Sequence, residues 1–280
     1  MSSTWRQLLG EAQRRLDSAT EARRIVEEAS GYQGAAYVDA LDHRALPQAH
    51  QSFAAMVERR AAGEPLQYVL GGWGFRRLDL YLDRRVLIPR PETEIVVQAA
   101  LGEVERLGTT PVVADLGTGS GAIALSLAVE VPGAEVWATD LSAEALDVAR
   151  ANLAGAGSLA ASHVRLAHGR WFDALPSTLR GQLGLVVSNP PYIADGEELP
   201  PEVEDWEPRA ALRAGPTGLE QVEAIVTAAP DWLARPGAVV VEIAPHQATQ
   251  TAGLAEAVGY TEVEVRQDLS GRDRMIVARF

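Results

Sequence analysis

Residues 112–121 read Val-Val-Ala-Asp-Leu-Gly-Thr-Gly-Ser-Gly, and the helical stretch Ala122–Val129 follows them directly. A short apolar run, then an acid, then a glycine-rich loop that opens a helix is typical of the first turn of a nucleotide-binding α/β sheet. Gly117 and Gly119 let the backbone turn tightly and approach a ligand closely. No Gly-Lys-Ser/Thr sequence follows the glycines, which excludes a P-loop.

Strand-like apolar runs recur along the rest of the chain, and helical stretches separate the first five of them. This alternation predicts a mostly parallel sheet with helices on both faces. Only a short turn, Asp268–Asp273, joins the last two strands, so that pair must be antiparallel. The strands that we expect in this seven-stranded α/β sheet are Val112–Ala114, Glu135–Thr139, Val164–Ala167, Leu185–Ser188, Ala238–Ile243, Glu262–Gln267 and Met275–Ala278.

The residues ahead of this sheet have the pattern of a small helical bundle. Ser18 and Glu21 form the signature of a helix capping box, and a later helix ends at Gly63 and Pro65. The apolar residues that recur at helical spacing near the start of the chain are Trp5, Leu8, Leu9, Ala12 and Leu16. These narrow stripes indicate a domain held together by ordinary core packing.

A β-hairpin is predicted to join the helical bundle to the sheet. Leu66–Leu70 and Phe75–Leu82 flank the glycine-rich segment Gly71–Gly74, and Leu78–Asp83 alternates apolar and polar residues with a period of two. The domains that we expect are a helical domain at 1–64, a hairpin linker at 65–87 and a catalytic domain at 88–280.

The glycine-rich loop and the next strand together predict an adenosine-containing cofactor. Asp140 ends that strand about 20 residues after the loop, where a carboxylate can accept hydrogen bonds from both ribose hydroxyls. With Ala122 the loop also fits the dinucleotide fingerprint, so the loop alone does not identify the cofactor. The acid that leads the loop, Asp115, suits the cationic S-adenosylmethionine better than a pyrophosphate.

Residues 188–193 read Ser-Asn-Pro-Pro-Tyr-Ile and close the fourth strand. Pro190 and Pro191 lack backbone N–H groups, so the segment offers acceptors and few donors. Asn189 precedes a proline and is pushed toward an extended conformation, so its side-chain carbonyl and the next backbone carbonyl can point into one space. Two such acceptors suit a planar –NH2 group, with the Tyr192 ring against its flat face. The segment predicts a cradle for an amide or an exocyclic amine, and a plain Pro-Pro turn is the alternative.

The two motifs are expected to meet, because the first and fourth strands of a doubly wound sheet are neighbours at the topological switch point. A methyl donor beside a held –NH2 group is a coherent methyl-transfer site. Amide nitrogen is a poor nucleophile because its lone pair is delocalised into the carbonyl. Two acceptors that fix both hydrogens would aim the nitrogen at the methyl group and stabilise the positive charge that develops on it.

Composition narrows the function further. The 280 residues carry 25 Lys and Arg against 38 Asp and Glu, a net charge of −13, which argues against a broad phosphate-binding face but is compatible with a local basic patch. The chain has no cysteine and its histidines show no metal-ligand spacing, so we expect neither disulfides nor a metal site. Without an apolar signal core or a run of transmembrane length, a cytoplasmic enzyme is expected.

Two aromatic residues, Trp171 and Phe172, come just after the third strand. One of them can stack on an adenine ring, with Asp173 nearby, and core packing is the alternative. The segment Asp195–Gly218 is long and rich in proline, with seven acids between Asp195 and Glu207. Such a loop predicts a lid or a docking edge for a basic partner surface, or else a solvated loop.

The chain resembles the peptide chain release factor N5-glutamine methyltransferases of the HemK/PrmC type over nearly its full length. The Ile88–Glu94 segment is the most specific, because Asn-Pro-Pro-Tyr also resembles the motif of methyltransferases acting on adenine or guanine amino groups. The segments that carry the resemblance are Gly63-Glu-Pro-Leu-Gln-Tyr, Leu87-Ile-Pro-Arg-Pro-Glu-Thr-Glu, Asp115-Leu-Gly-Thr-Gly-Ser-Gly, Trp171-Phe, Ser188-Asn-Pro-Pro-Tyr-Ile, Trp206-Glu-Pro-Arg-Ala-Ala-Leu and Val241-Glu-Ile.

The resemblance implies an S-adenosylmethionine-dependent enzyme that methylates the glutamine amide of the Gly-Gly-Gln motif in class I release factors, with the N-terminal helical domain docking the substrate. The net charge of −13 opposes stable nucleic-acid binding, and we expect no membrane binding. The implied cofactor-binding residues are Gly117, Thr118, Gly119, Ser120, Gly121, Asp140, Trp171 and Asn189. The residues implied to hold the glutamine are Asn189, Pro190, Pro191 and Tyr192. The alternative is a methyltransferase of nucleic-acid amino groups, at adenine N6 or guanine N2.

Overall fold

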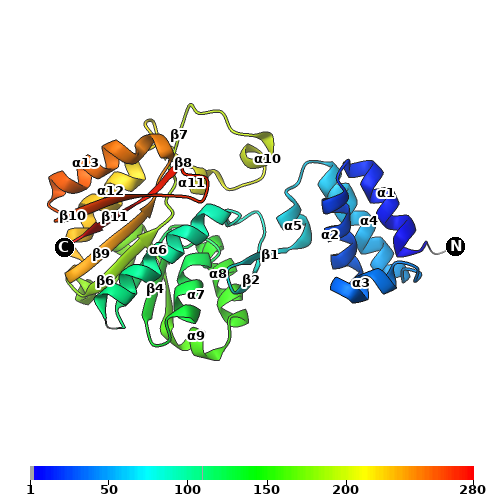
Figure 1. Cartoon of the computed structure of the whole chain (residues 1–280), viewed down its shortest axis with the longest axis horizontal. Helices are drawn as coiled ribbons and strands as arrows, with labels where there is room; N and C mark the ends of the chain where they lie inside the picture. The colour runs from blue at the N-terminus through cyan, green and yellow to red at the C-terminus, as the bar shows by residue number, and fades with distance from the viewer. Residues whose placement is uncertain (1–2, 109) are drawn as a thin grey trace. The chain divides into compact units, whose positions relative to one another are not determined.

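The computed structural model describes residues 3–108 and 110–280, and they form two compact units. The first unit runs to Gly72 and includes Pro201–Trp206. The second unit holds Trp73–Pro200 and Glu207–Phe280. Figure 1 shows both units and labels most of their helices and strands.

The first unit is helical, as the apolar spacing predicts. Its core is apolar and includes Leu8 and Ile25, and the ring of Trp5 meets that of Phe53 edge-on at 6.4 Å. The helices of this unit are α1 (Trp5–Leu16), α2 (Ala19–Ser30), α3 (Gly34–Ala40), α4 (Pro47–Ala61), α5 (Leu66–Leu70) and α10 (Pro201–Glu204).

The predicted first strand of the hairpin is absent. Leu66–Leu70, where we expected that strand, forms the short helix α5, so this prediction is wrong. The guanidinium of Arg59 donates to the backbone carbonyls of Tyr68 (2.9 Å) and Val69 (3.3 Å), which satisfies acceptors that the end of the helix leaves open. A five-residue apolar run has no periodicity that separates a helical turn from a strand.

The hairpin is present, but it begins at Gly72, after helix α5. Strands β1 (Gly72–Phe75) and β2 (Leu78–Tyr81) turn at Arg76 and Arg77 rather than at the glycines. Arg76 has a positive φ of 50° and is held there because its N–H donates to Glu94 (3.1 Å) and its guanidinium pairs with Glu130 (2.6 Å). The alternation predicted for β2 is confirmed, with its leucines buried and its Asp and Tyr exposed.

The second unit is built around a seven-stranded sheet in the order β10-β11-β9-β6-β3-β4-β5. Every predicted strand of this sheet is present. Strands β5, β4, β3, β6 and β9 run parallel, whereas β11 runs antiparallel to both β9 and β10, as the short last turn requires. The strand bounds are β3 (Val112–Leu116), β4 (Glu135–Asp140), β5 (Val164–His168), β6 (Leu183–Ser188), β9 (Leu233–Glu242), β10 (Glu262–Gln267) and β11 (Asp273–Arg279).

Helices cover both faces of this sheet, and Figure 1 shows α12 and α13 on one side and α6 and α7 on the other. On the α12 side, Ile225 packs in one apolar cluster with Leu116 of β3 and Val186 of β6. The described part of the chain contains no helix with the length and apolar character to cross a membrane. The helices of this unit are α6 (Pro91–Leu107), α7 (Ala122–Glu130), α8 (Ala143–Gly155), α9 (Ser158–His163), α11 (Arg209–Leu212), α12 (Glu220–Ala228) and α13 (Ala248–Val258).

The acidic segment predicted as a loop contains short elements of its own. Strand β8 (Arg213–Gly215) lies near its end and pairs in parallel with β7 (Ile193–Ala194), which immediately precedes the segment, and the helices α10 and α11 lie between these strands in the sequence. Not every acid in it is solvated. Glu207 is buried and accepts from the backbone N–H of Ile88 (3.0 Å) and from the guanidinium of Arg90.

A buried ion pair joins helix α6 to the last strand of the sheet. Arg279 donates two hydrogen bonds to Glu103, at 2.7 and 2.8 Å, and both side chains are almost fully buried. Although burial alone would raise it, the guanidinium groups of Arg279 and Arg106 lower the pKa of Glu103. The pair is therefore fully charged at neutral pH.

Replacing Arg279 with Met should lower the free energy of unfolding by about 3 kcal/mol, because it leaves the buried Glu103 carboxylate with weaker partners. Arg150→Met is the matched control, since it breaks the exposed Arg150–Asp147 pair and should change stability by less than about 0.5 kcal/mol. Urea unfolding of both variants measures the difference. Equal stabilities of the two variants would contradict the assigned role of the buried pair.

Candidate active site

The two sequence motifs leave the sheet side by side, as their predicted strand order requires. Strand β3 pairs in parallel with β6, with Asp115 opposite Val187. One residue further on, the Ser188 hydroxyl donates to the backbone carbonyl of Leu116 at 2.5 Å. The glycine-rich loop and the Asn-Pro-Pro-Tyr segment therefore begin at the same edge of the sheet.

The glycine-rich loop is held by the neighbouring strand β4. The backbone N–H groups of Gly117 and Thr118 both donate to the carbonyl of Thr139, at 2.9 and 2.8 Å. Gly117 has a φ of 76°, and a Cβ at this position would lie 3.0 Å from Cζ3 of Trp171. Trp171 thus lies against the loop, and this close approach requires the absence of a side chain at residue 117.

Asp140 reaches the same loop from the end of β4. Its Oδ2 accepts from the backbone N–H of Gly119 at 2.8 Å, and its Oδ1 accepts from the N–H of Ser142 at 2.8 Å. Burial raises the pKa of Asp140, and the two N–H groups oppose that shift. Each carboxylate oxygen keeps a further lone pair, so the carboxylate can position the loop and still accept from a ligand hydroxyl.

The buried Asp115 carboxylate has one oxygen without a protein partner. Its Oδ2 accepts from the Thr118 hydroxyl (2.6 Å) and from the N–H of Ala124 (3.0 Å), whereas Oδ1 has no hydrogen bond within the described residues. Burial raises the pKa of Asp115 to about 7. A buried carboxylate oxygen needs a donor or a cation. The positively charged S-adenosylmethionine fits this requirement.

Of the two aromatic candidates, Phe172 lies within the core, whereas Trp171 packs against that core and also approaches Gly117 of the loop. Phe172 is buried and stacks on Trp232 with ring centroids 5.5 Å apart. Trp171 is half-buried, and its indole N–H has no hydrogen-bond acceptor in the described part of the protein. The contact with Gly117 and the unsatisfied indole N–H keep Trp171 as the candidate for cofactor binding, whereas Phe172 follows the core-packing alternative.

Asn189 is tied to two residues that the sequence did not single out as functional. Its Nδ2 donates to Oγ1 of Thr93 at 3.1 Å, and the Thr93 hydroxyl donates to Oε2 of Glu242 at 2.8 Å. The Tyr192 hydroxyl lies 3.5 Å from Oε1 of the same carboxylate. Burial raises the pKa of Glu242 to about 7. In the sequence, the one indication that Thr93 and Glu242 belong to the site is that both lie in segments that carry the family resemblance.

Two buried amide side chains position the motifs through the backbone. Gln247 donates from Nε2 to the carbonyls of Tyr192 and Gly218, both at 2.9 Å. Asn152 exchanges hydrogen bonds with the N–H (2.7 Å) and carbonyl (3.1 Å) of Tyr81 and donates to the carbonyl of Ser120 (2.8 Å). Asn152 thus joins the hairpin to the glycine-rich loop, and no motif in the sequence indicates this role.

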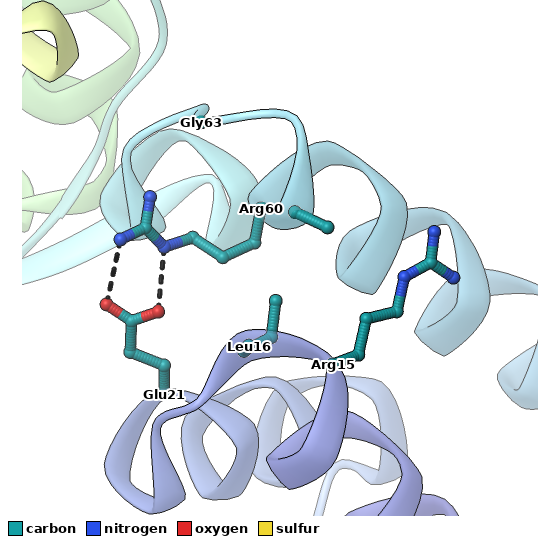
Figure 2. A pocket seen from close by; sticks show the side chains of 6 residues that line it. Arg15, Leu16, Glu21, Arg60 and Gly63 are labelled. Atoms are coloured by element: carbon teal, nitrogen blue, oxygen red, sulfur yellow. Dashed lines mark hydrogen bonds and ion pairs between the residues drawn. The ribbon is translucent and has the colours of Figure 1, made fainter.

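A separate small pocket lies within the first unit, with a volume of about 170 Å³ (Figure 2). Arg60 lies across it and donates to both carboxylate oxygens of Glu21, at 2.7 and 3.0 Å, and also to Glu202. The Ser18 hydroxyl accepts from the N–H of Glu21, as in a capping box, but the Glu21 carboxylate faces Arg60 instead of returning to Ser18. The charged groups that line this pocket are already paired, Arg15 with Glu58 and Arg60 with Glu21 and Glu202.

The fold and the site define an S-adenosylmethionine-dependent methyltransferase. Residues 98–204 match the family described as Methyltransferase small domain, and residues 4–71 match the PrmC N-terminal domain. The release factor glutamine methyltransferase of Cereibacter sphaeroides is 41% identical over 268 residues, covering 94% of this chain and 91% of that protein. That of Deinococcus radiodurans is 39% identical over 284 residues, covering 98% of each. The chain belongs to the release factor glutamine methyltransferase family.

Solved structures agree on the fold. The hMettl16 catalytic domain in complex with MAT2A 3'UTR hairpin 1 has a TM-score of 0.58 at 15% identity and covers 82% of this chain and 80% of that one. A methyltransferase from Pyrococcus furiosus has a TM-score of 0.50 at 16% identity, covering 81% and 96%. At these identities the likeness concerns the architecture alone.

Asp115→Asn should weaken S-adenosylmethionine binding at least about tenfold, because an amide cannot offset the positive charge of the ligand. In the unchanged protein, affinity should fall as the pH is lowered through about 7, since a proton then competes with the cationic ligand for Asp115. In the variant that dependence should disappear. Calorimetric titration between about pH 6 and pH 8 measures both effects.

Asp147→Asn is the control, because this exposed carboxylate on α8 forms an ion pair with Arg150 at the protein surface. It should bind the cofactor with unchanged affinity and unchanged pH dependence. An Asp115→Asn protein that bound as tightly as this control would show that Asp115 does not face the cofactor.

Proposed function

We propose that this protein transfers a methyl group from S-adenosylmethionine to the side-chain amide nitrogen, N5, of the glutamine in the Gly-Gly-Gln motif of class I peptide chain release factors. The observation that carries the proposal is the junction of two motifs: the Ser188 hydroxyl bonded to the Leu116 carbonyl joins an amide cradle to a cofactor loop. Family membership identifies the amide as that of a release factor glutamine.

The cofactor is held by the loop and by the strand ends beside it. When bound, S-adenosylmethionine supplies an electrophilic methyl group on a positively charged sulfur. Asp115 would offer its unpaired oxygen to that positive charge, Asp140 would accept from the ribose hydroxyls, and the indole of Trp171, which lies beside Gly117, would contact the adenosine. The remaining loop residues, Gly117, Thr118, Gly119, Ser120 and Gly121, let the backbone approach the ligand.

The acceptor glutamine is held by the segment from Asn189 to Tyr192. The Asn189 side-chain oxygen and the Pro190 carbonyl accept the two hydrogens of the glutamine –NH2 group, and Tyr192 covers its flat face. Because Pro190 and Pro191 lack N–H groups, this segment presents mainly acceptors, which match the hydrogens of the glutamine –NH2 group. Fixing both hydrogens aims the nitrogen for in-line attack and stabilises the positive charge that develops on it.

The helical first unit is the proposed docking domain for the release factor. Support comes from its match to the PrmC N-terminal domain over residues 4–71. The net charge of −13 disfavours stable nucleic-acid binding and leaves a protein as the macromolecular substrate. The likeness to an RNA-bound methyltransferase is one of fold and adds no support for a nucleic-acid acceptor.

Labelled S-adenosylmethionine tests the proposed substrate directly. The protein is incubated with a release factor, with the same factor carrying Gln→Ala in its Gly-Gly-Gln motif, or with nucleic acid. Label should enter only the unmutated release factor. Label in nucleic acid, or equal label in the Gln→Ala factor, would overturn the proposal.

Asn189→Ala should lower kcat at least about a hundredfold, because it removes an acceptor that orients and stabilises the reacting nitrogen. Cofactor affinity should stay within about threefold. Gln182→Ala is the control, since this exposed amide precedes the opposite end of the same strand. Single-turnover methyl transfer gives the rate and calorimetry gives the affinity. Loss of cofactor binding instead would assign Asn189 mainly to the cofactor.

A further inference from the structure

We propose that Thr93 and Glu242 are positioning residues that determine which way the Asn189 amide faces, so that its oxygen and not its –NH2 group is presented to the substrate. The proposal deepens the proposed function and rests on it. Glu242 is the last residue of β9 and Thr93 lies in the first turn of α6. Strand β9 pairs with β6 so that Val241 is opposite Ser188, which brings Glu242 level with Asn189.

We call the chain of hydrogen bonds Asn189–Thr93–Glu242 the relay. The direction of its hydrogen bonds follows from which groups can donate and which can accept. When Glu242 is ionised, its carboxylate only accepts, so the Thr93 hydroxyl donates its single hydrogen to Glu242. The Thr93 oxygen then has only lone pairs left for Asn189, and only the amide nitrogen can donate to them. The charge on Glu242 thus determines the orientation of the amide two hydrogen bonds away.

The consequence falls on the other arm of the Asn189 amide. With Nδ2 bound to Thr93, Oδ1 points away from the relay, and it makes no hydrogen bond to any residue that the structure describes. It is therefore available as an acceptor for a substrate –NH2 group. In the flipped orientation two –NH2 groups would face each other, each a donor without an acceptor.

Thr93 and Glu242 are shielded from solvent, so the direction of their hydrogen bonds has an energetic consequence. Thr93 is 3% exposed and Glu242 is 1% exposed. Water can therefore not replace a missing partner freely, and an unsatisfied polar group at this depth is costly. Both residues lie in segments that carry the family resemblance, and the proposed cofactor and substrate contacts do not use either of them.

The charges around Glu242 come from each element packed against it. Helix α6 contributes Glu92 beside Thr93, the segment after β6 contributes the Tyr192 hydroxyl, and β11 contributes Arg274. Burial raises the pKa of Glu242 and Glu92 adds to the effect, whereas Arg274 and the two hydroxyl donors oppose it. Arg274 is itself paired with Asp268 at 3.3 Å, which limits its effect on Glu242.

Protonation of Glu242 would reverse the relay. A neutral carboxyl group can donate to the Thr93 oxygen, which frees the Thr93 hydrogen for Oδ1 of Asn189 and favours the flipped amide. Methyl transfer at saturating cofactor and release factor should therefore slow as the pH falls through about 7. Saturating cofactor removes the separate effect of Asp115 on cofactor binding.

Thr93→Val, Thr93→Ser and Glu242→Gln test the relay in the full-length protein, with a release factor as substrate. Thr93→Val should lower kcat at least tenfold, with KM for the release factor and cofactor Kd within threefold, and Thr93→Ser should restore kcat to within threefold. Glu242→Gln, which keeps the side-chain shape, should abolish the loss of rate at low pH. Thr251→Val is the control, because Thr251 is a buried helical threonine whose hydroxyl has no hydrogen-bond partner among the residues that the structure describes.

The outcomes separate the relay from the proposed function. If the unchanged protein does not methylate the release factor, the proposed function fails. If it does, and Thr93→Val matches Thr251→Val in kcat, the relay is wrong. A Thr93→Ser protein as slow as Thr93→Val, or a Glu242→Gln protein that keeps the acidic loss of rate, would also overturn the relay. Thermal unfolding of each variant confirms that it is folded. If Thr93→Val does not fold, the pH dependence of the Glu242→Gln protein alone tests the relay.

Discussion

The parallel pairing of β3 with β6 is the constraint on which the rest of the site depends. Because the carboxyl ends of parallel strands meet at one edge, this pairing brings a loop rich in glycine next to a segment rich in acceptors. A slip of one residue would turn every side chain of a strand to the opposite face. The bond from the Ser188 hydroxyl to the Leu116 carbonyl fixes the register where the two motifs begin.

The sheet was predictable because its signals are local. Each strand is an apolar run bounded by helical stretches, and the length of the last turn alone determines that the final pair is antiparallel. The linker was predicted less well, because its conformation depends on distant partners. Arg76 occupies a turn with positive φ only because Glu94 and Glu130 hold its backbone and side chain. No pattern within the linker contains that information.

The same division applies to the site. The glycine-rich loop, Asp140 and Asn189 are readable because their residue types and spacing already carry the chemistry. The groups that orient them are not readable, since their partners are remote in sequence. Thr93 and Glu242 are 149 positions apart, and Asn152 lies 71 positions from Tyr81. The motifs therefore predict what the site acts on, and the tertiary hydrogen bonds determine which way its groups face.

The buried carboxylates show how stability and function divide in this protein. Glu103 has arginine partners, so its pKa is lowered and its charge stabilises the fold at neutral pH. Asp115 and Glu242 have none within hydrogen-bonding distance among the described residues, and burial raises the pKa of each to about 7.

Between the ordinary carboxyl pKa of about 4 and about 7, the folded state binds more protons at Asp115 and Glu242 than the unfolded chain does. Their contribution to the free energy of unfolding therefore falls as the pH rises through that window. A positive partner on either group would relieve this cost, but it would neutralise the charge that Asp115 offers to a cationic ligand and disturb the carboxylate that orients Asn189 through Thr93.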